Sequence, residues 1–194
     1  EVTSDFQDLA VQGVLTCRIK DARKAAATLD FSVDQLAAVA IPAASPETLA
    51  THPNKGSGGL KGFLAANKDR EVTFASAGVG SGSHLAAEYF FKVHAKAKVL
   101  HVPFRGGAPA IQAVLGDQID LIASSFGVTS QVVEGKLTGL AVASPLRNPA
   151  MPNVPTYKES GFDFEAESWV GFFVPAKTDP AIVEKLNAEI DKVV

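Results

Sequence analysis

The sequence predicts an α/β protein with a mainly parallel sheet that helices cover on both faces. Short apolar runs alternate with helical segments between residues 72 and 143, and the connections between them are rich in glycine. Because each strand–helix–strand unit needs a crossover connection, consecutive strands are expected to run parallel. A hydrophobic content of 46% with 20% charged residues indicates a chain that buries a core.

The central segment supplies the alternating elements in order. Pro103 stops the second expected strand, Pro109 fits the first turn of a helix, and Gly135 is a typical residue just after a helix end. The expected strands are 72–77, 98–102, 119–124 and 137–143, and the expected helices between them are 84–94, 108–115 and 128–134.

The flanks are predicted to add further elements. Thr156 and Glu159 have the spacing of a capping box, and Asp179 followed by Pro180 is a typical helix start. The expected helices here are 22–29, 60–67 and 180–194, and the expected strands are 36–41 and 169–174. The chain begins at Glu1 without a leader and its last helix lacks a stop signal, so we expect a trimmed or fragmentary product.

Composition excludes several function classes. A formal charge of −3 gives no basic footprint for nucleic acid, and no apolar run reaches the roughly 20 residues that span a bilayer. The single cysteine, Cys17, forbids an internal disulfide or a CxxC framework. We therefore expect neither nucleic-acid binding, nor a membrane-spanning helix, nor a redox centre.

The segment 76–84, Ser-Ala-Gly-Val-Gly-Ser-Gly-Ser-His, joins an expected strand to a helix start. Its glycines let the backbone approach a ligand, and the first-turn amides of the helix lack intrahelical partners. Together with the helix dipole, these features predict an anion site that needs no lysine or arginine. A plain strand–helix turn with a capping serine is the equally weighted alternative.

Nucleotide, metal and most catalytic motifs do not fit this loop. Ser83 stands where a dinucleotide fingerprint needs its third glycine, and no Gly-Lys-Ser/Thr sequence follows the loop. No Gly-x-Ser-x-Gly elbow and no His-x-x-x-His spacing occurs, so neither a hydrolase motif nor a metal site is predicted. A hydrolase that uses His84 with Ser81 or Ser83 is retained as the alternative from another class.

Two further strand ends carry small or polar residues. Phe104, Arg105 and Gly106 follow the second strand, and Ser124 with Ser125 ends the third. Carboxyl ends of parallel strands meet at one edge of a sheet, where ligands bind. Such ends are more typical of a binding cleft than of a catalytic one. The predicted ligand-binding residues are Ser76, Gly78, Gly80, Ser81, Ser83, His84, Phe104, Arg105, Gly106 and Ser124.

Six motifs occur in order from about residue 70 to the end of the chain. They are SAGVGSGSHL (76–85), HVPFRGGAPA (101–110), GDQIDL (116–121), EGKLTGLAV (134–142), PNVPTYKESG (152–161) and WVGFFVPA (169–176). Together these motifs resemble the solute-binding receptors of tripartite tricarboxylate transporters, also called Bug-type receptors.

This resemblance implies a periplasmic, two-lobed Venus-flytrap receptor that closes on a small organic carboxylate and delivers it to a membrane permease. It implies a monomer with no cofactor, no metal and no catalysis. One lobe is expected to span 52–168, with 1–51 and 169–194 forming part of the other.

Two departures from the family pattern refine these expectations. Parts of the first lobe that relatives carry have no counterpart here, so a truncated lobe that binds nothing is a further alternative. Many relatives also carry an aspartate where this chain has Ser124-Ser125, which favours plain carboxylates over acidic amino acids.

Overall fold

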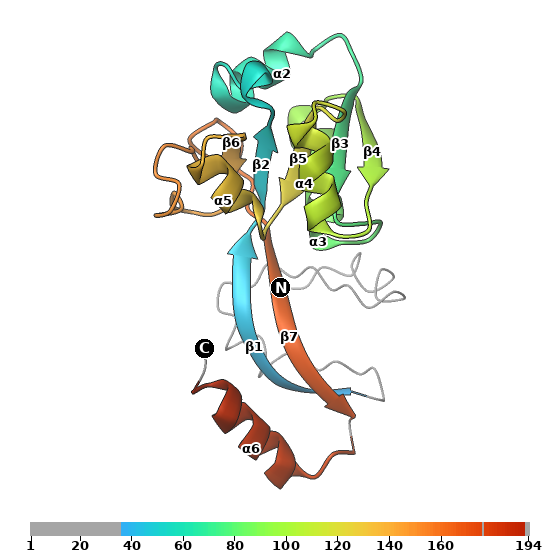
Figure 1. The fold of residues 1–194 in the computed structure, drawn as a ribbon, viewed down its shortest axis with the longest axis vertical. Coiled ribbons are helices and arrows are strands. Elements are labelled where there is room, and N and C mark those ends of the chain that lie inside the picture. The colour runs from blue at the N-terminus through green and yellow to red at the C-terminus, as the bar shows by residue number, and fades with distance from the viewer. Residues whose placement is uncertain (1–35, 176, 193–194) are drawn as a thin grey trace. The chain divides into compact units, whose positions relative to one another are not determined.

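The structure, a computed structural model, describes residues 36–175 and 177–192 (Figure 1). One compact unit comprises Pro46–Ser168, and a second comprises the described residues up to Ser45 together with those from Trp169 onward. The expected helix at 22–29 lies outside the described residues. No helix among the described residues is long and apolar enough to cross a membrane.

The first unit is built on a five-stranded sheet with the order β4-β3-β5-β2-β6. β3 is parallel to β4 and β5, whereas β2 is antiparallel to β5 and β6. Four of these five strands therefore share one direction, and the predicted α/β class with a mainly parallel sheet is confirmed. The strands are β2 (Thr48–Thr51), β3 (Val72–Ser76), β4 (Val99–Pro103), β5 (Leu121–Ser124) and β6 (Thr138–Val142).

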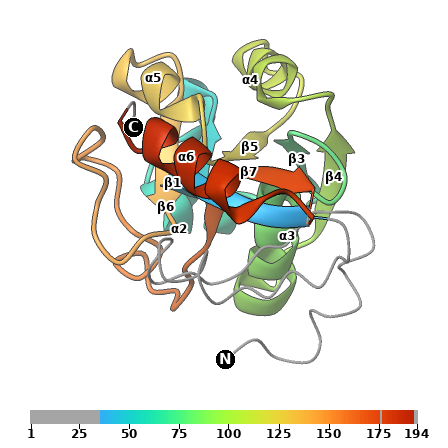
Figure 2. The same ribbon diagram turned by 90° about the horizontal axis from the view of Figure 1, so that it is seen from below.

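Helices cover both faces of this sheet (Figure 2). Side chains alternate along each strand, so Phe74 packs with one helical layer while Ala75 packs with the other. The first layer holds α2 (Gly59–Ala66) and α3 (Gly82–Tyr89), and the second holds α4 (Gly107–Leu115) and α5 (Val128–Val133). A short 3₁₀ segment, η2 (Pro53–Lys55), follows β2.

The helix expected at 84–94 is divided in two. After α3 the chain continues as a π-helical segment, η3 (Phe90–Ala95), which ends at Lys96 with a φ of 50°. The adjacent Phe90 and Phe91 of this segment are both fully buried in the same core.

The connection after β6 contains the predicted capping box. The Thr156 amide donates to Glu159 Oε2 at 2.8 Å, and the Glu159 amide donates to Thr156 Oγ1 at 3.1 Å. Arg147 donates from Nε to the same carboxylate at 2.9 Å. This reciprocal pair fixes the turn that carries the fully buried Tyr157.

In the second unit, β1 (Leu36–Pro46) and β7 (Glu167–Pro175) form a two-stranded sheet, and α6 spans Pro180–Ile190. Asp179 caps α6 by accepting from the Ala181 amide at 2.9 Å, as its sequence predicts. The prediction that the first strand stops at Pro42 is wrong, because each strand of a two-stranded sheet leaves one side unpaired and tolerates proline there. The described part of the final helix ends earlier than the predicted 180–194.

Candidate carboxylate site

The carboxyl ends of β3, β4 and β5 meet at one edge of the five-stranded sheet, and we call this region the carboxyl edge. It comprises the loops 77–81, 104–106 and 125–127, and the residue before the antiparallel strand β2. The helices α3 and α4 begin directly after the first two loops. The edge predicted for ligand binding is therefore the one where these loops gather.

The loop after β3 is held by its own polar groups. Ser81 is the N-cap of α3, where its Oγ accepts from the His84 amide at 3.2 Å and donates to the Gly78 carbonyl at 2.8 Å. The Gly80 amide donates to His84 Nδ1 at 3.1 Å. Gly78 and Gly80 have φ values of 141° and 78°, in the region that favours glycine. The sequence thus folds here into a rigid turn.

Two histidines stack beneath this turn. The rings of His84 and His101 lie 3.9 Å apart between centroids, and Phe74 stacks on His101 at 4.8 Å. His101 Nε2 and Ser76 Oγ are hydrogen-bonded at 2.7 Å. Burial lowers the pKa of both histidines below the ordinary value, which favours the neutral form of both rings at pH 7.

The second loop lies against the first. The Gly106 amide donates to the Ala77 carbonyl at 3.1 Å, and the Phe104 amide donates to the Ser76 carbonyl at 3.1 Å. Phe104 is half-buried and packs against the core under α4, whereas Arg105 is exposed and makes no hydrogen bond or ion pair with the described residues. Gly106, with a φ of 109°, caps α4 without a side-chain hydrogen bond.

The end of β5 completes the edge. Ser124 is buried opposite Thr48, and its Oγ donates to the Phe126 carbonyl at 2.7 Å. Ser125 is buried beside it. The structure therefore brings the predicted residues of all three loops to one edge. It also shows that the hydroxyls of Ser76, Ser81 and Ser124 hold their own loops.

Sequence reasoning missed one residue at this edge. Glu47, directly before β2, is only 3% exposed. Its backbone amide donates to the Ala166 carbonyl at 2.9 Å, and its carbonyl accepts from the Ala143 amide at 2.8 Å. Burial raises the pKa of its carboxyl, although nearby hydroxyls of Ser168, Ser83 and Ser125 act in the opposite direction. The sequence offers no signal for Glu47, because the strand that positions it is not predicted.

The arrangement gives no support to the hydrolase alternative. His84 Nδ1 accepts from a backbone amide and its ring is stacked, while the Ser81 hydroxyl donates to a carbonyl. The Ser76 hydroxyl is hydrogen-bonded to the His101 ring, but Ser76 is fully buried. Within 36–175 and 177–192, no group of three or more His, Cys, Asp or Glu side chains is placed to hold a metal ion.

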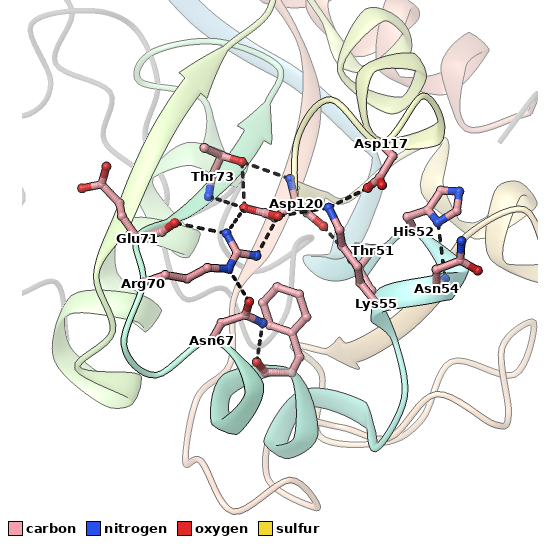
Figure 3. Close-up of polar contacts among 11 residues, drawn as sticks. Thr51, His52, Asn54, Lys55, Asn67, Arg70, Glu71, Thr73, Asp117 and Asp120 are labelled. Atoms are coloured by element: carbon pink, nitrogen blue, oxygen red, sulfur yellow. Dashed lines mark hydrogen bonds and ion pairs between the residues drawn. The ribbon is translucent and has the colours of Figure 1, made fainter.

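The opposite edge of the sheet, the amino edge, contains a charged network around Asp120 (Figure 3). The Asp120 carboxylate accepts two hydrogen bonds of 2.8 Å from Arg70 and one of 2.9 Å from the Thr73 amide. Lys55 Nζ reaches Asp120 at 3.1 Å and Asp117 at 2.6 Å. Burial alone would raise the pKa of Asp120, but these donors lower it far below its usual range.

Comparison with solved structures places this fold in the class of periplasmic solute-binding proteins. A protein described as a periplasmic transporter has a TM-score of 0.77 at 28% identity, with 82% of this chain and 54% of that one covered. MatC from Rhodopseudomonas palustris, solved with bound malate, has a TM-score of 0.77 at 29% identity, with coverages of 87% and 60%. The periplasmic binding protein BugD has a TM-score of 0.70 at 30% identity, with coverages of 76% and 50%.

Sequence comparison gives the family. Residues 18–194 match the model of the tripartite tricarboxylate transporter family receptor, and the chain belongs to that family. Protein BugT of Bordetella pertussis is 32% identical over 164 residues, which are 82% of this chain and 50% of BugT. A Pseudomonas protein encoded between tcbD and tcbE is 38% identical over 129 residues, 64% of this chain and 38% of that protein. The predicted family is confirmed, and the chain spans at most half of these two relatives.

Proposed function

We propose that this chain binds a small organic carboxylate at the carboxyl edge, as part of a periplasmic receptor that delivers the ligand to a membrane permease. Membership of the receptor family and the likeness to malate-bound MatC support this proposal. The receptor acts as a monomer, needs no cofactor and leaves the ligand chemically unchanged. Residues 52–168 form one lobe in this proposal, with the remaining residues contributing to the other.

The hydrogen bond between the Gly106 amide and the Ala77 carbonyl carries the proposal. It fixes two glycine loops side by side, so the first turns of α3 and α4 begin at the same edge. First-turn amides such as those of Gly82 and Ser83 lack intrahelical acceptors, and helix dipoles add partial positive charge. An anion is therefore attracted without a paired lysine or arginine.

The predicted residues take different roles in this site. Ser76, Gly78, Gly80 and Ser81 shape the first loop, and His84 supports it from below. The remaining residues of the proposed site are Ser83 with its hydroxyl, Phe104 and Gly106 as the wall of the second loop, Arg105 as an exposed cation, and Ser124 at the end of β5.

Titration calorimetry with malate, succinate and adipate tests the proposal, with glycerol as a neutral control. We expect saturable binding of at least one dicarboxylate, and recovery of that ligand unchanged. Ser83→Ala should weaken the binding by about 0.5–1.5 kcal/mol, the contribution of one hydrogen bond. The control Ser57→Ala, at an exposed residue of the amino edge, should not affect it.

Each competing function has its own outcome. If the folded chain binds none of the three acids, the truncated-lobe alternative holds and the proposal is wrong. If a ligand is converted and His84→Ala abolishes the conversion, the enzyme alternative replaces it. If Ser83→Ala and Ser57→Ala weaken ligand binding equally, the site does not lie at α3.

A further inference from the structure

The position of Glu47 is set by its backbone. Thr48 pairs with Ser124 of β5 and with Val142 of β6, so the preceding residue lies at the carboxyl edge. Both backbone polar groups of Glu47 are hydrogen-bonded, to Ala166 and Ala143. Its side chain is thus presented by a fixed strand junction.

The two carboxyl oxygens of Glu47 are used differently. Oε1 accepts a hydrogen bond from Ser168 Oγ, whereas Oε2 is buried and has no hydrogen-bond partner among the described residues. The hydroxyls of Ser83 and Ser125 lie near the same carboxyl. A buried oxygen without a hydrogen-bond partner costs free energy. The presence of such an oxygen at Glu47 is therefore explained if a further group forms a hydrogen bond with it.

We propose that Glu47 is a specificity-determining residue of the proposed carboxylate site, and that its Oε2 hydrogen-bonds a carboxylate oxygen of the ligand. This inference rests on the proposed function. Ser83 connects Glu47 with the proposed carboxylate site, because it stands in the first turn of α3 and also beside the Glu47 carboxyl.

A proton must accompany such a contact. Two carboxylates at hydrogen-bond distance cannot both be ionised, so one proton lies between Oε2 and the ligand oxygen. Ser168 already donates to Oε1, which leaves Oε2 to carry the proton and donate it toward the ligand. Burial raises the pKa of Glu47 and so favours this protonated form.

Tyr157 is buried close to this carboxyl, and its own pKa is raised by burial and by Glu47, so it stays neutral. The titratable residues on the elements that supply Ser83 and Ser168 are His84, Glu88 and Tyr89 on α3 and Glu167 on β7. A ligand bound through a protonated carboxyl should lose affinity as pH rises.

The test compares Glu47→Leu and Glu47→Gln with the wild-type chain, using malate, succinate and adipate between pH 5.5 and 8.5. Leucine removes both oxygens, so it should weaken binding of the best acid at pH 6 by about tenfold or more, as for a hydrogen bond to a charged group. Glutamine keeps a donor that cannot ionise. It should hold affinity within about threefold and flatten the loss of affinity at high pH. Glu71→Gln, an exposed carboxylate at the amino edge, is the matched control.

The outcomes separate this inference from the proposed function. Absence of binding by both the wild-type chain and Glu71→Gln overturns the proposed function and this inference with it. Binding that is unchanged in Glu47→Leu overturns the inference alone and assigns Glu47 a structural role. If Glu47→Leu does not fold, the pH profile of Glu47→Gln decides, because a profile identical to wild type also overturns the inference.

Discussion

The two edges of the five-stranded sheet organise polar groups in opposite ways. At the amino edge, Asp120 is surrounded by Arg70 and Lys55, and Lys55 also pairs with Asp117. At the carboxyl edge, neutral hydroxyls, neutral histidines and backbone amides predominate, and the buried Glu47 has one unpartnered oxygen.

This difference separates a structural edge from a binding edge. Charges that satisfy one another fix the start of β3 and β5 but offer nothing to a ligand. Neutral donors around two helix starts can attract an anion and still release it, because the cation of the proposed site, Arg105, is exposed and no buried countercharge is part of that site. The following predictions test whether stability resides at one edge and affinity at the other.

Asp120→Asn should give the largest loss of stability. The substitution leaves Arg70 and Lys55 without their buried partner, and we expect the free energy of unfolding to fall by roughly 2–3 kcal/mol, less than for a fully buried pair because both cations are partly exposed. Urea unfolding followed by circular dichroism measures this, with carboxylate affinity unchanged. Asp117→Asn, at a half-exposed partner of Lys55, should cost less than about 1 kcal/mol.

The same variant has a defined pH dependence. The pKa of Asp120 is lower in the folded chain than in the unfolded chain, so its stabilisation is complete above the unfolded value of about 4 and is lost as pH falls below it. The stability difference between wild type and Asp120→Asn should therefore stay constant from pH 5 to 8 and shrink toward pH 2. A difference independent of pH over that whole range would contradict an ionised Asp120 network.

Gly80→Ala and Gly59→Ala should have effects of intermediate size, and the two substitutions can be compared directly. Both glycines have positive φ, 78° and 62°, and an added Cβ would meet no atom within 4 Å at either position. Each substitution should cost about 1 kcal/mol of stability through backbone strain. Only Gly80→Ala should also weaken dicarboxylate binding in calorimetry, because Gly59 begins α2 away from the carboxyl edge. Equal affinity in the two variants would contradict a site at the loop 77–81.

Arg105→Gln should have the smallest effect. The side chain is exposed, so its attraction for an anion is weak and screened by salt. We expect the Kd for malate to rise about twofold to threefold at low ionic strength and to match wild type in roughly 0.5 M NaCl. Lys98→Gln, which removes the same charge from an exposed residue just before β4, should leave Kd unchanged at both salt concentrations.

The sequence predicts the fold well where the local pattern of apolar residues determines the strand or helix. From Val72 onward, apolar strands and amphipathic helices follow each other as expected, with boundaries that differ by one to a few residues. β2 is not predicted, because Thr-Leu-Ala-Thr (48–51) carries little apolar character although all four residues are buried. Its burial comes from its place between β5 and β6, which no local pattern specifies.

The candidate site is predictable only in part for the same reason. The glycine loops and their serines stand out in the sequence, because they directly follow strands. Glu47 precedes its strand, and only the antiparallel direction of β2 brings it to the same edge. His101 is recognisable as a strand residue, but its stacking on His84 depends on the pairing of β4 with β3.

The π-helical segment after α3 connects the aromatic core to the candidate site. Phe91 in this segment packs against Phe74, and the Phe74 ring also stacks with His84. A substitution at Phe91 is therefore expected to disturb the histidine stack beneath the loop 77–81 as well as the core.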